Sequence, residues 1–218
     1  MSPELAASAT ERTTAATDLL LAVAAFAGAW RLVRPSPASL ASRIWAGALA
    51  AAGLASMLGT VTHGFVLPEA LRELLWQPLF ILLGVTVACF VAGAVADAYG
   101  PRPARLVLVV MMLAALGFYL ATRRSGGDFG VFVVFQAVGL LAAIAIYLHL
   151  AARRRPGAGL VAAALAVSLV AGAIQANDAL ALRLVWEFDH NGLYHLVQLG
   201  GLALLVAGLK TSLRFSRT

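Results

Sequence analysis

Three polar side chains stand where the last apolar segment of this sequence begins: His190, His195 and Gln198. Of the two remaining histidines, only His63 closes an apolar segment that is expected to end on the same side of the protein. Three neutral imidazoles with one open coordination position form the ligand set of a hydrolytic zinc centre, in which the metal activates a bound water. The residue types therefore predict a Zn²⁺ site formed by His63, His190 and His195.

Such a centre also needs a carboxylate that orients a ligand or carries the proton of the water. The candidates for this role at the expected depth are Glu73, Asp178, Asp18 and Asp189. The sequence does not rank these carboxylates against one another.

Two hydroxyl residues precede His63 on the same side of a predicted helix. Ser56, Gly59, Thr60 and His63 follow the spacing i, i+3, i+4, i+7 of a single helix face. Either Thr60 or Ser56 is expected to hold the water or to polarise a substrate carbonyl, and glycine on this face lets a neighbouring helix approach closely.

The histidine spacing also allows a different interpretation. His190 and His195 are five residues apart, which on one continuous helix separates them by about 140°. The pair Asn191-Gly192 favours a turn or a helix start, so His190 is expected just before the helix, folded back over the site. A metal site further requires the second and seventh helices to be neighbours. Alternatively, the histidines are ordinary interfacial residues satisfied by water, and both interpretations stay open.

The amino-acid composition indicates the class of protein to which these residues belong. The chain has 218 residues, of which 61% are hydrophobic and 12% charged, and its mean hydropathy is +0.89. Soluble proteins carry about 25% charged residues, so this is predicted to be an integral membrane protein. The net charge of +6 comes from short loops between apolar runs, which argues against nucleic acid as a partner.

A membrane-spanning helix needs about 20 predominantly apolar residues. Stretches that meet this requirement predict an all-α bundle of seven transmembrane helices, formed by residues 1–218 as a single domain. The polar residues that precede the first stretch lack the basic character of a secretory signal, so this span is expected to be retained. The predicted spans are 14–33, 41–63, 74–98, 104–122, 129–151, 157–178 and 192–212.

Basic residues predict the orientation, because they are enriched in cytoplasmic loops. The distribution places the N-terminus outside and the C-terminus in the cytoplasm. The composition is rich in alanine and arginine, which fits a bacterial protein of the cytoplasmic (inner) membrane. The richer side carries Arg31, Arg34, Arg43, Arg102, Arg105, Arg153, Arg154, Arg155, Lys210, Arg214 and Arg217; the other side carries Arg12, Arg72, Arg123, Arg124 and Arg183.

Polar residues within the predicted spans lie almost entirely in the outer half. Buried polar groups are costly in lipid and tend to mark sites or pathways, so this asymmetry predicts a pocket that is closed towards the cytoplasm. Asp97, near the inner edge, is expected to pair with Arg102 or Arg105. Residues 179–188 are expected on the outer surface, as a short amphipathic helix, a lid or a loop. Besides the predicted metal ligands and catalytic residues, the predicted pocket contains Asp18, Gln77, Gln136, Gln175, Asn191 and Gln198.

Three short stretches of the sequence resemble motifs of a known superfamily. Ser56-Met57-Leu58-Gly59-Thr60-Val61-Thr62-His63 resembles the span-two motif of the seven-transmembrane zinc hydrolases that include alkaline ceramidases and adiponectin-receptor-type (PAQR) proteins. Leu71-Arg72-Glu73-Leu74-Leu75-Trp76 resembles the acidic stretch that opens their third span. Tyr194-His195-Leu196-Val197-Gln198-Leu199-Gly200-Gly201 resembles the aromatic and histidine segment of their last span.

The resemblance implies a zinc held by one histidine of span two and two of span seven, and it favours Glu73 as the carboxylate. This sequence departs from the motifs at two places. Gly59 stands where the superfamily has serine, and Asn191 stands where it has the other span-seven histidine, with His190 one residue further back.

The resulting prediction is a zinc-dependent membrane hydrolase that acts on a lipid amide or ester, with a membrane lipid as substrate or ligand. The competing interpretation is a non-enzymatic seven-span protein that uses the same polar residues as a metal or proton transporter or as a ligand or pH sensor. A third is a structural membrane subunit. Rhodopsin-like retinal binding is disfavoured, because Lys210 lies at the inner end of the last span.

Overall fold

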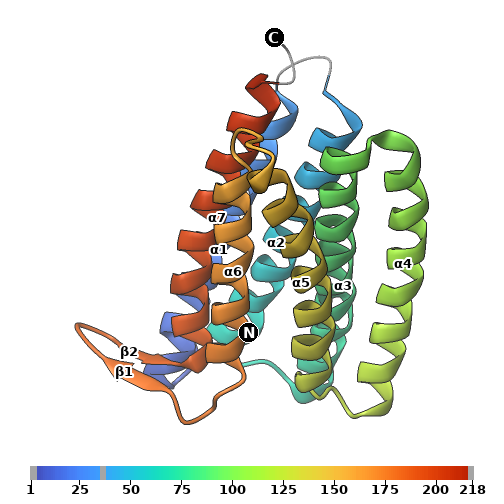
Figure 1. Ribbon diagram of the computed structural model, residues 1–218. Coiled ribbons are helices and arrows are strands. Elements are labelled where there is room, and N and C mark those ends of the chain that lie inside the picture. The colour runs from blue at the N-terminus through green and yellow to red at the C-terminus, as the bar shows by residue number, and fades with distance from the viewer. Residues whose placement is uncertain (1–3, 35–37, 216–218) are drawn as a thin grey trace.

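The computed structural model describes residues 4–34 and 38–215, with side chains through Ser212. Within these residues the chain forms seven long helices and one two-stranded hairpin (Figure 1). In chain order the elements are α1 (Ala9–Val33), α2 (Leu40–Gly64), α3 (Glu69–Tyr99), α4 (Pro101–Arg124), α5 (Gly130–Ala152), α6 (Ala158–Gln175), β1 (Ala181–Arg183), β2 (Glu187–Asp189) and α7 (His190–Phe215).

All seven helices are long and apolar enough to cross a membrane, which confirms the predicted all-α, seven-helix architecture. The helix ends differ from the predicted spans where polar residues continue a helix beyond its apolar part. Helix α3 begins at Glu69 instead of residue 74, because hydropathy detects only the apolar part of a helix. Helix α6 ends at Gln175, three residues before the predicted end.

Helix α1 packs between the two helices that carry His63 and His195. Helix α1 packs against both α2 and α7, while α6 packs between α5 and α7, and α4 lies at the edge of the bundle against α3 (Figure 1). Helices α2 and α7, which were expected to be direct neighbours, share little contact in the described residues, because α1 packs against both histidine-bearing helices. Gly59 of α2 allows the close approach, since a Cβ there would overlap the Asp18 carboxylate of α1.

The N-terminal segment and the first turn of α1 are fixed at the same end. The Ser8 hydroxyl caps α1 by accepting the Glu11 N–H, as is usual for serine at a helix start. Leu5 forms a β-bridge with Phe65 just after α2. The Ala6 N–H donates to the Gly64 carbonyl at 2.9 Å. These contacts hold the first turn of α1 beside the end of α2.

Residues 179–188 do not form the amphipathic helix that was considered for them. They contain strand β1 and most of strand β2, which pair antiparallel with Leu182 opposite Phe188. The Thr13 hydroxyl donates to the Glu187 carbonyl at 2.6 Å, so α1 supports the hairpin. Of the six strand residues only Phe188 is buried, and the others are exposed or partly exposed.

The predicted pairing of Asp97 with Arg102 or Arg105 was also wrong. The Asp97 Oδ2 atom accepts hydrogen bonds from Trp45 Nε1 at 2.9 Å and from the Tyr147 hydroxyl at 2.5 Å. Helix α3 turns this carboxylate into the bundle, where α2 and α5 supply the donors. Asp97 thus joins three helices near the end opposite the hairpin.

The Asp97 cluster should stabilise the fold measurably. Removing the Tyr147 hydroxyl (Tyr147→Phe) is expected to lower the stability by about 1.5–3 kcal/mol, the usual contribution of a hydrogen bond to a charged group. Thermal unfolding of the purified protein in detergent would measure this. Tyr99→Phe is the control, because Tyr99 is 62% exposed. Equal melting temperatures for the two variants would contradict a stabilising role for the cluster.

Candidate active site

An internal cavity of about 330 Å³ lies between six of the seven helices. The part that reaches towards the middle of the bundle is lined by apolar side chains such as Leu49, Val87 and Leu202. Its other part carries the polar residues of the site and lies towards the end of the bundle that bears the hairpin. Polar residues on its wall are Asp18, Ser56, His63, Thr86, Gln136, Ser168, Gln175, Asp178, His190, Asn191, Tyr194, His195 and Gln198.

A carboxylate and an imidazole are in direct contact on this wall. His195 Nε2 of α7 lies 3.2 Å from Asp18 Oδ1 of α1, and their side chains are only 8% and 5% exposed. The other ring nitrogen, Nδ1, lies 3.1 Å from the Thr17 hydroxyl. Both nitrogens of His195 therefore have a partner on α1. A metal ion at this histidine would have to displace one of them.

His63 is held by a residue that the sequence did not suggest. Its Nδ1 atom lies 2.7 Å from Glu11 Oε2, in the first turn of α1. The ring also meets Trp76 edge-on, with centroids 6.0 Å apart. A carboxylate on one nitrogen fixes the orientation of an imidazole, which leaves Nε2 as the nitrogen that can act on a ligand.

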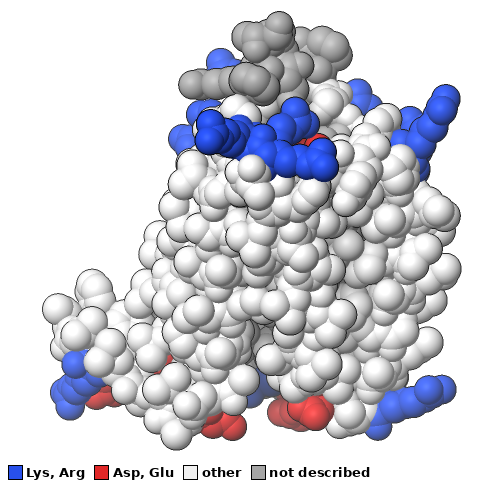
Figure 2. All heavy atoms as spheres, in the orientation of Figure 1, with Lys and Arg blue, Asp and Glu red and all other residues white. Residues whose placement is uncertain are grey.

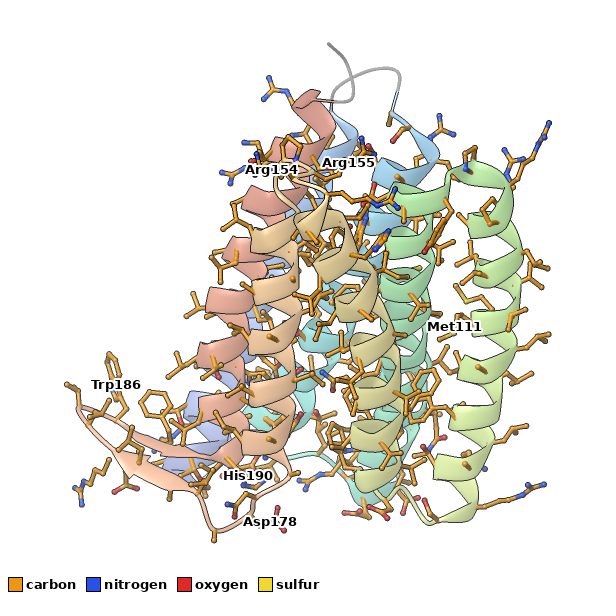
Figure 3. All side chains as sticks on the ribbon, in the orientation of Figure 1. Met111, Arg154, Arg155, Asp178, Trp186 and His190 are labelled. Atoms are coloured by element: carbon orange, nitrogen blue, oxygen red, sulfur yellow. The ribbon has the colours of Figure 1, made fainter. Side chains whose placement is uncertain are left out.

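His190 is the first residue of α7, lines the cavity and lies beside Asp178 at the hairpin end of the bundle (Figure 3). Its Nε2 atom is 3.5 Å from Asp178 Oδ1, and the Asp178 side chain is 93% exposed. The neighbouring Asp189 caps α7 by accepting the Gly192 N–H at 2.8 Å, and it accepts the Thr14 hydroxyl at 3.0 Å. Asp189 thus has a structural role, while His190 and Asp178 stand at the opening.

Amide side chains from three helices line the same cavity. Gln198 donates to the Ser168 hydroxyl at 3.0 Å, and Gln175 donates to Asn191 Oδ1 at 3.4 Å. Within the described part of the chain, the Oε1 atoms of Gln136, Gln175 and Gln198 are buried without a hydrogen-bond partner. Buried acceptors are rarely left unsatisfied, so the cavity suits a ligand or water molecules that carry hydrogen-bond donors.

Three of the predicted site residues do not line this cavity. Glu73 is exposed, Gln77 instead accepts the Tyr119 hydroxyl at 3.2 Å, and the Thr60 hydroxyl donates to the Ser56 carbonyl. Of the two hydroxyl candidates, Ser56 is the one on the wall. Of the four carboxylates that the sequence left as candidates, Asp18 is the one in direct contact with a buried histidine, His195.

Sequence reasoning missed Glu11 and Thr17 for identifiable reasons. Glu11 was treated as part of a polar terminus, although Ser8-x-x-Glu11 is a helix-start pattern. That pattern predicts a helix that begins before the apolar stretch. Thr17 was missed because it is one of four threonines between residues 10 and 17, and no spacing among them indicates a site.

The three predicted zinc ligands share one cavity, but they are not arranged as a coordination group. Among the described residues, no three histidine, cysteine, aspartate or glutamate side chains are placed to hold one metal ion. Each histidine instead faces a carboxylate: His63 faces Glu11, His195 faces Asp18 and His190 faces Asp178. The Zn²⁺ site stays a prediction.

Comparison with known proteins assigns the chain to a family but not to an activity. No curated protein and no solved structure matches this sequence. A family model matches residues 13–214, which include all seven helices in whole or in large part. The chain therefore belongs to DUF6962, a family of unknown function.

Proposed function

We propose that this protein is an integral membrane hydrolase that cleaves an amide or ester bond of a lipid. The observation that carries the proposal is the buried Asp18–His195 pair at the polar part of a cavity whose remainder is apolar. An amphiphile fits such a cavity with its acyl chain among leucine and valine side chains and its polar group beside the pair. Buried ionisable residues within membrane helices commonly mark functional sites.

The chemistry of the polar residues supports hydrolysis. The Asp18–His195 pair would accept a proton from a water molecule as that water adds to the lipid carbonyl. The pair would then return the proton to the departing amine or alcohol. Ser56 is on the same wall and interacts with Asp18, so its hydroxyl would help to position the water. The unpaired amide oxygens would accept donors of the lipid polar group.

Charge distribution supports the orientation that we propose. Figure 2 shows a broad group of basic side chains at the end of the bundle opposite the hairpin, whereas the hairpin end carries both signs. Since basic residues are enriched on the cytoplasmic side, the polar part of the cavity would face away from the cytoplasm. The expected location is the inner membrane of a bacterium, with the N-terminus outside.

A second candidate is a proton-linked sensor or transporter. It is favoured by the carboxylate contacts of His63 and His195, since such pairs can change protonation when a ligand or proton arrives. Under this alternative the protein would bind its ligand without cleaving it. The Glu11–His63 pair lies at the hairpin end of the bundle, away from the apolar part of the cavity. Under this alternative, the protonation of this pair would respond to the outer pH.

One experiment separates the two candidates. Purified protein in lipid nanodiscs would be incubated with acyl amides and esters, and released fatty acid and zinc content would be measured on the same sample. We expect time-dependent fatty acid release by the wild type. About one zinc per chain that is lost in His63→Ala would support the metal prediction. Absence of release with every lipid, together with His195-dependent proton flux in proteoliposomes, would overturn the hydrolase proposal.

A further inference from the structure

A second cavity, of about 530 Å³, lies on the outside of the bundle between α1, α7 and the hairpin. One wall is a stripe of α1 that includes Ala9, Arg12, Ala16 and Leu20. The opposite wall is made mainly of apolar side chains of β2, its preceding turn and α7. This groove is separate from the internal cavity, which faces the interior of the helix bundle.

The α1 wall is about as long as one leaflet of the bilayer core is thick, and the part from Arg12 to Leu20, about 12 Å, accommodates part of one acyl chain. From Ala9 to Leu20 the α1 stripe extends over eleven residue steps, which is about 16 Å at 1.5 Å per residue. The hydrocarbon core of a bilayer is about 30 Å thick, so each leaflet contributes about half of that. Helix α1 is one of the seven candidate membrane spans. Lipid is therefore the molecule that surrounds this surface.

The two ends of the groove differ in polarity. Arg12 lies near the start of α1, and no described residue forms an ion pair with it. Ala16 and Leu20 follow at one-turn intervals and are exposed and apolar. Glu187 also borders the groove, but its carboxylate lies 3.4 Å from the Arg183 guanidinium. The uncompensated charge of the groove is thus positive and sits at one end.

The outer wall is a defined structure held by α1. Thr13 and Thr14 bind β2 through the Glu187 carbonyl and the Asp189 carboxylate, and Phe188 is buried beneath the strand. At the tip of the hairpin, by contrast, the Trp186 side chain is 65% exposed. Figure 3 places Trp186 towards the middle of the bundle from the level of Asp178 and His190. Tryptophan prefers such interfacial positions in membranes.

We propose that this groove binds a glycerophospholipid from the surrounding leaflet. The phosphate pairs with Arg12, whose guanidinium matches phosphate geometry, and one acyl chain follows Ala16 and Leu20 beneath Trp186. The bound lipid also packs behind the candidate active site, because Thr17 lines the groove and contacts His195 Nδ1. This site does not depend on the proposed hydrolase activity.

Native mass spectrometry of the full-length protein in mild detergent tests the proposal. The added probes are phosphatidylglycerol and a diacylglycerol with the same acyl chains. Arg12→Gln removes the phosphate partner, and Ala16→Trp fills the apolar part of the groove. Their controls are Arg72→Gln and Ala114→Trp, which change an exposed arginine of α3 and an exposed alanine of α4.

We expect Arg12→Gln to lower phosphatidylglycerol retention about tenfold, as the loss of one charge-assisted contact would, with diacylglycerol retention unchanged. Ala16→Trp should lower the retention of both lipids, while both controls behave like wild type. If Arg12→Gln and Arg72→Gln changed phosphatidylglycerol retention equally, the lipid would be attracted only by the general positive charge. This result would overturn the proposed site. Equal retention in Ala16→Trp and Ala114→Trp would overturn it as well.

Discussion

Asp18→Asn is expected to reduce lipid hydrolysis by about 10²–10⁴-fold, the usual contribution of a positioned acid or base. The substitution keeps the size of the side chain and can still hydrogen-bond His195, which lies 3.2 Å away. It removes the ability of the carboxylate to share a proton with the imidazole. The rate of fatty acid release in nanodiscs, compared with wild type at equal protein, measures the effect.

The matched control is Glu73→Gln, which distinguishes two assignments of the carboxylate. The superfamily resemblance favours Glu73, whereas the cavity favours Asp18, because Glu73 is exposed and does not line the cavity. We expect Glu73→Gln to retain nearly full activity. The reverse result, with activity lost in Glu73→Gln and kept in Asp18→Asn, would reject the internal cavity as the active site and support the resemblance instead.

Folding must be checked separately, because a buried polar substitution can also destabilise the protein. Asp18→Asn should retain a single elution peak and a melting temperature close to that of wild type. Lipid binding provides the second check: a variant that binds the substrate lipid but does not cleave it has lost chemistry and not structure. A variant that loses both, while its fold is intact, would assign Asp18 to ligand binding alone.

The sequence predicted the number and type of the helices because hydropathy acts over about 20 residues and is insensitive to detail. It also placed His63, His190 and His195 on one cavity, since residues at equal depth on the same side must lie near each other in a compact bundle. What it could not give is the lateral order of the helices. That order depends on side-chain shape at contacts such as Gly59 against Asp18.

The lateral order of the helices explains the main differences between the predicted site and the site in the structure. With α1 between α2 and α7, its residues reach both histidines: Glu11 contacts His63, while Asp18 and Thr17 contact His195. The resemblance directed attention to the start of the third span and hence to Glu73. The wrong pairing predicted for Asp97 has the same origin. Arg102 and Arg105 are near Asp97 in the sequence, but the lateral order of the helices brings donors from α2 and α5 to its carboxylate.

The position of α1 also links the two cavities. Thr17 contacts His195 on one side and lines the outer groove on the other, and Leu196 of the same groove follows His195 in the chain. A change in the packing of α1 would therefore alter both the internal cavity and the outer groove. Gly59 of α2 is one of the contacts that set this packing, because a Cβ there would overlap the Asp18 carboxylate of α1.

Gly59→Ala is expected to abolish the Asp18–His195 contact and with it most of the proposed activity. A Cβ at position 59 would overlap the Asp18 carboxylate, so this side chain must rotate away or α1 must move from α2. Gly47→Ala on the same helix is the matched control, since a Cβ there meets no atom within 4 Å. That control should be neutral or up to about 1 kcal/mol more stable, because alanine favours helix. Fatty acid release and melting temperature measure both variants, and a fully active Gly59→Ala would show that the tight α1–α2 contact does not position the carboxylate for function.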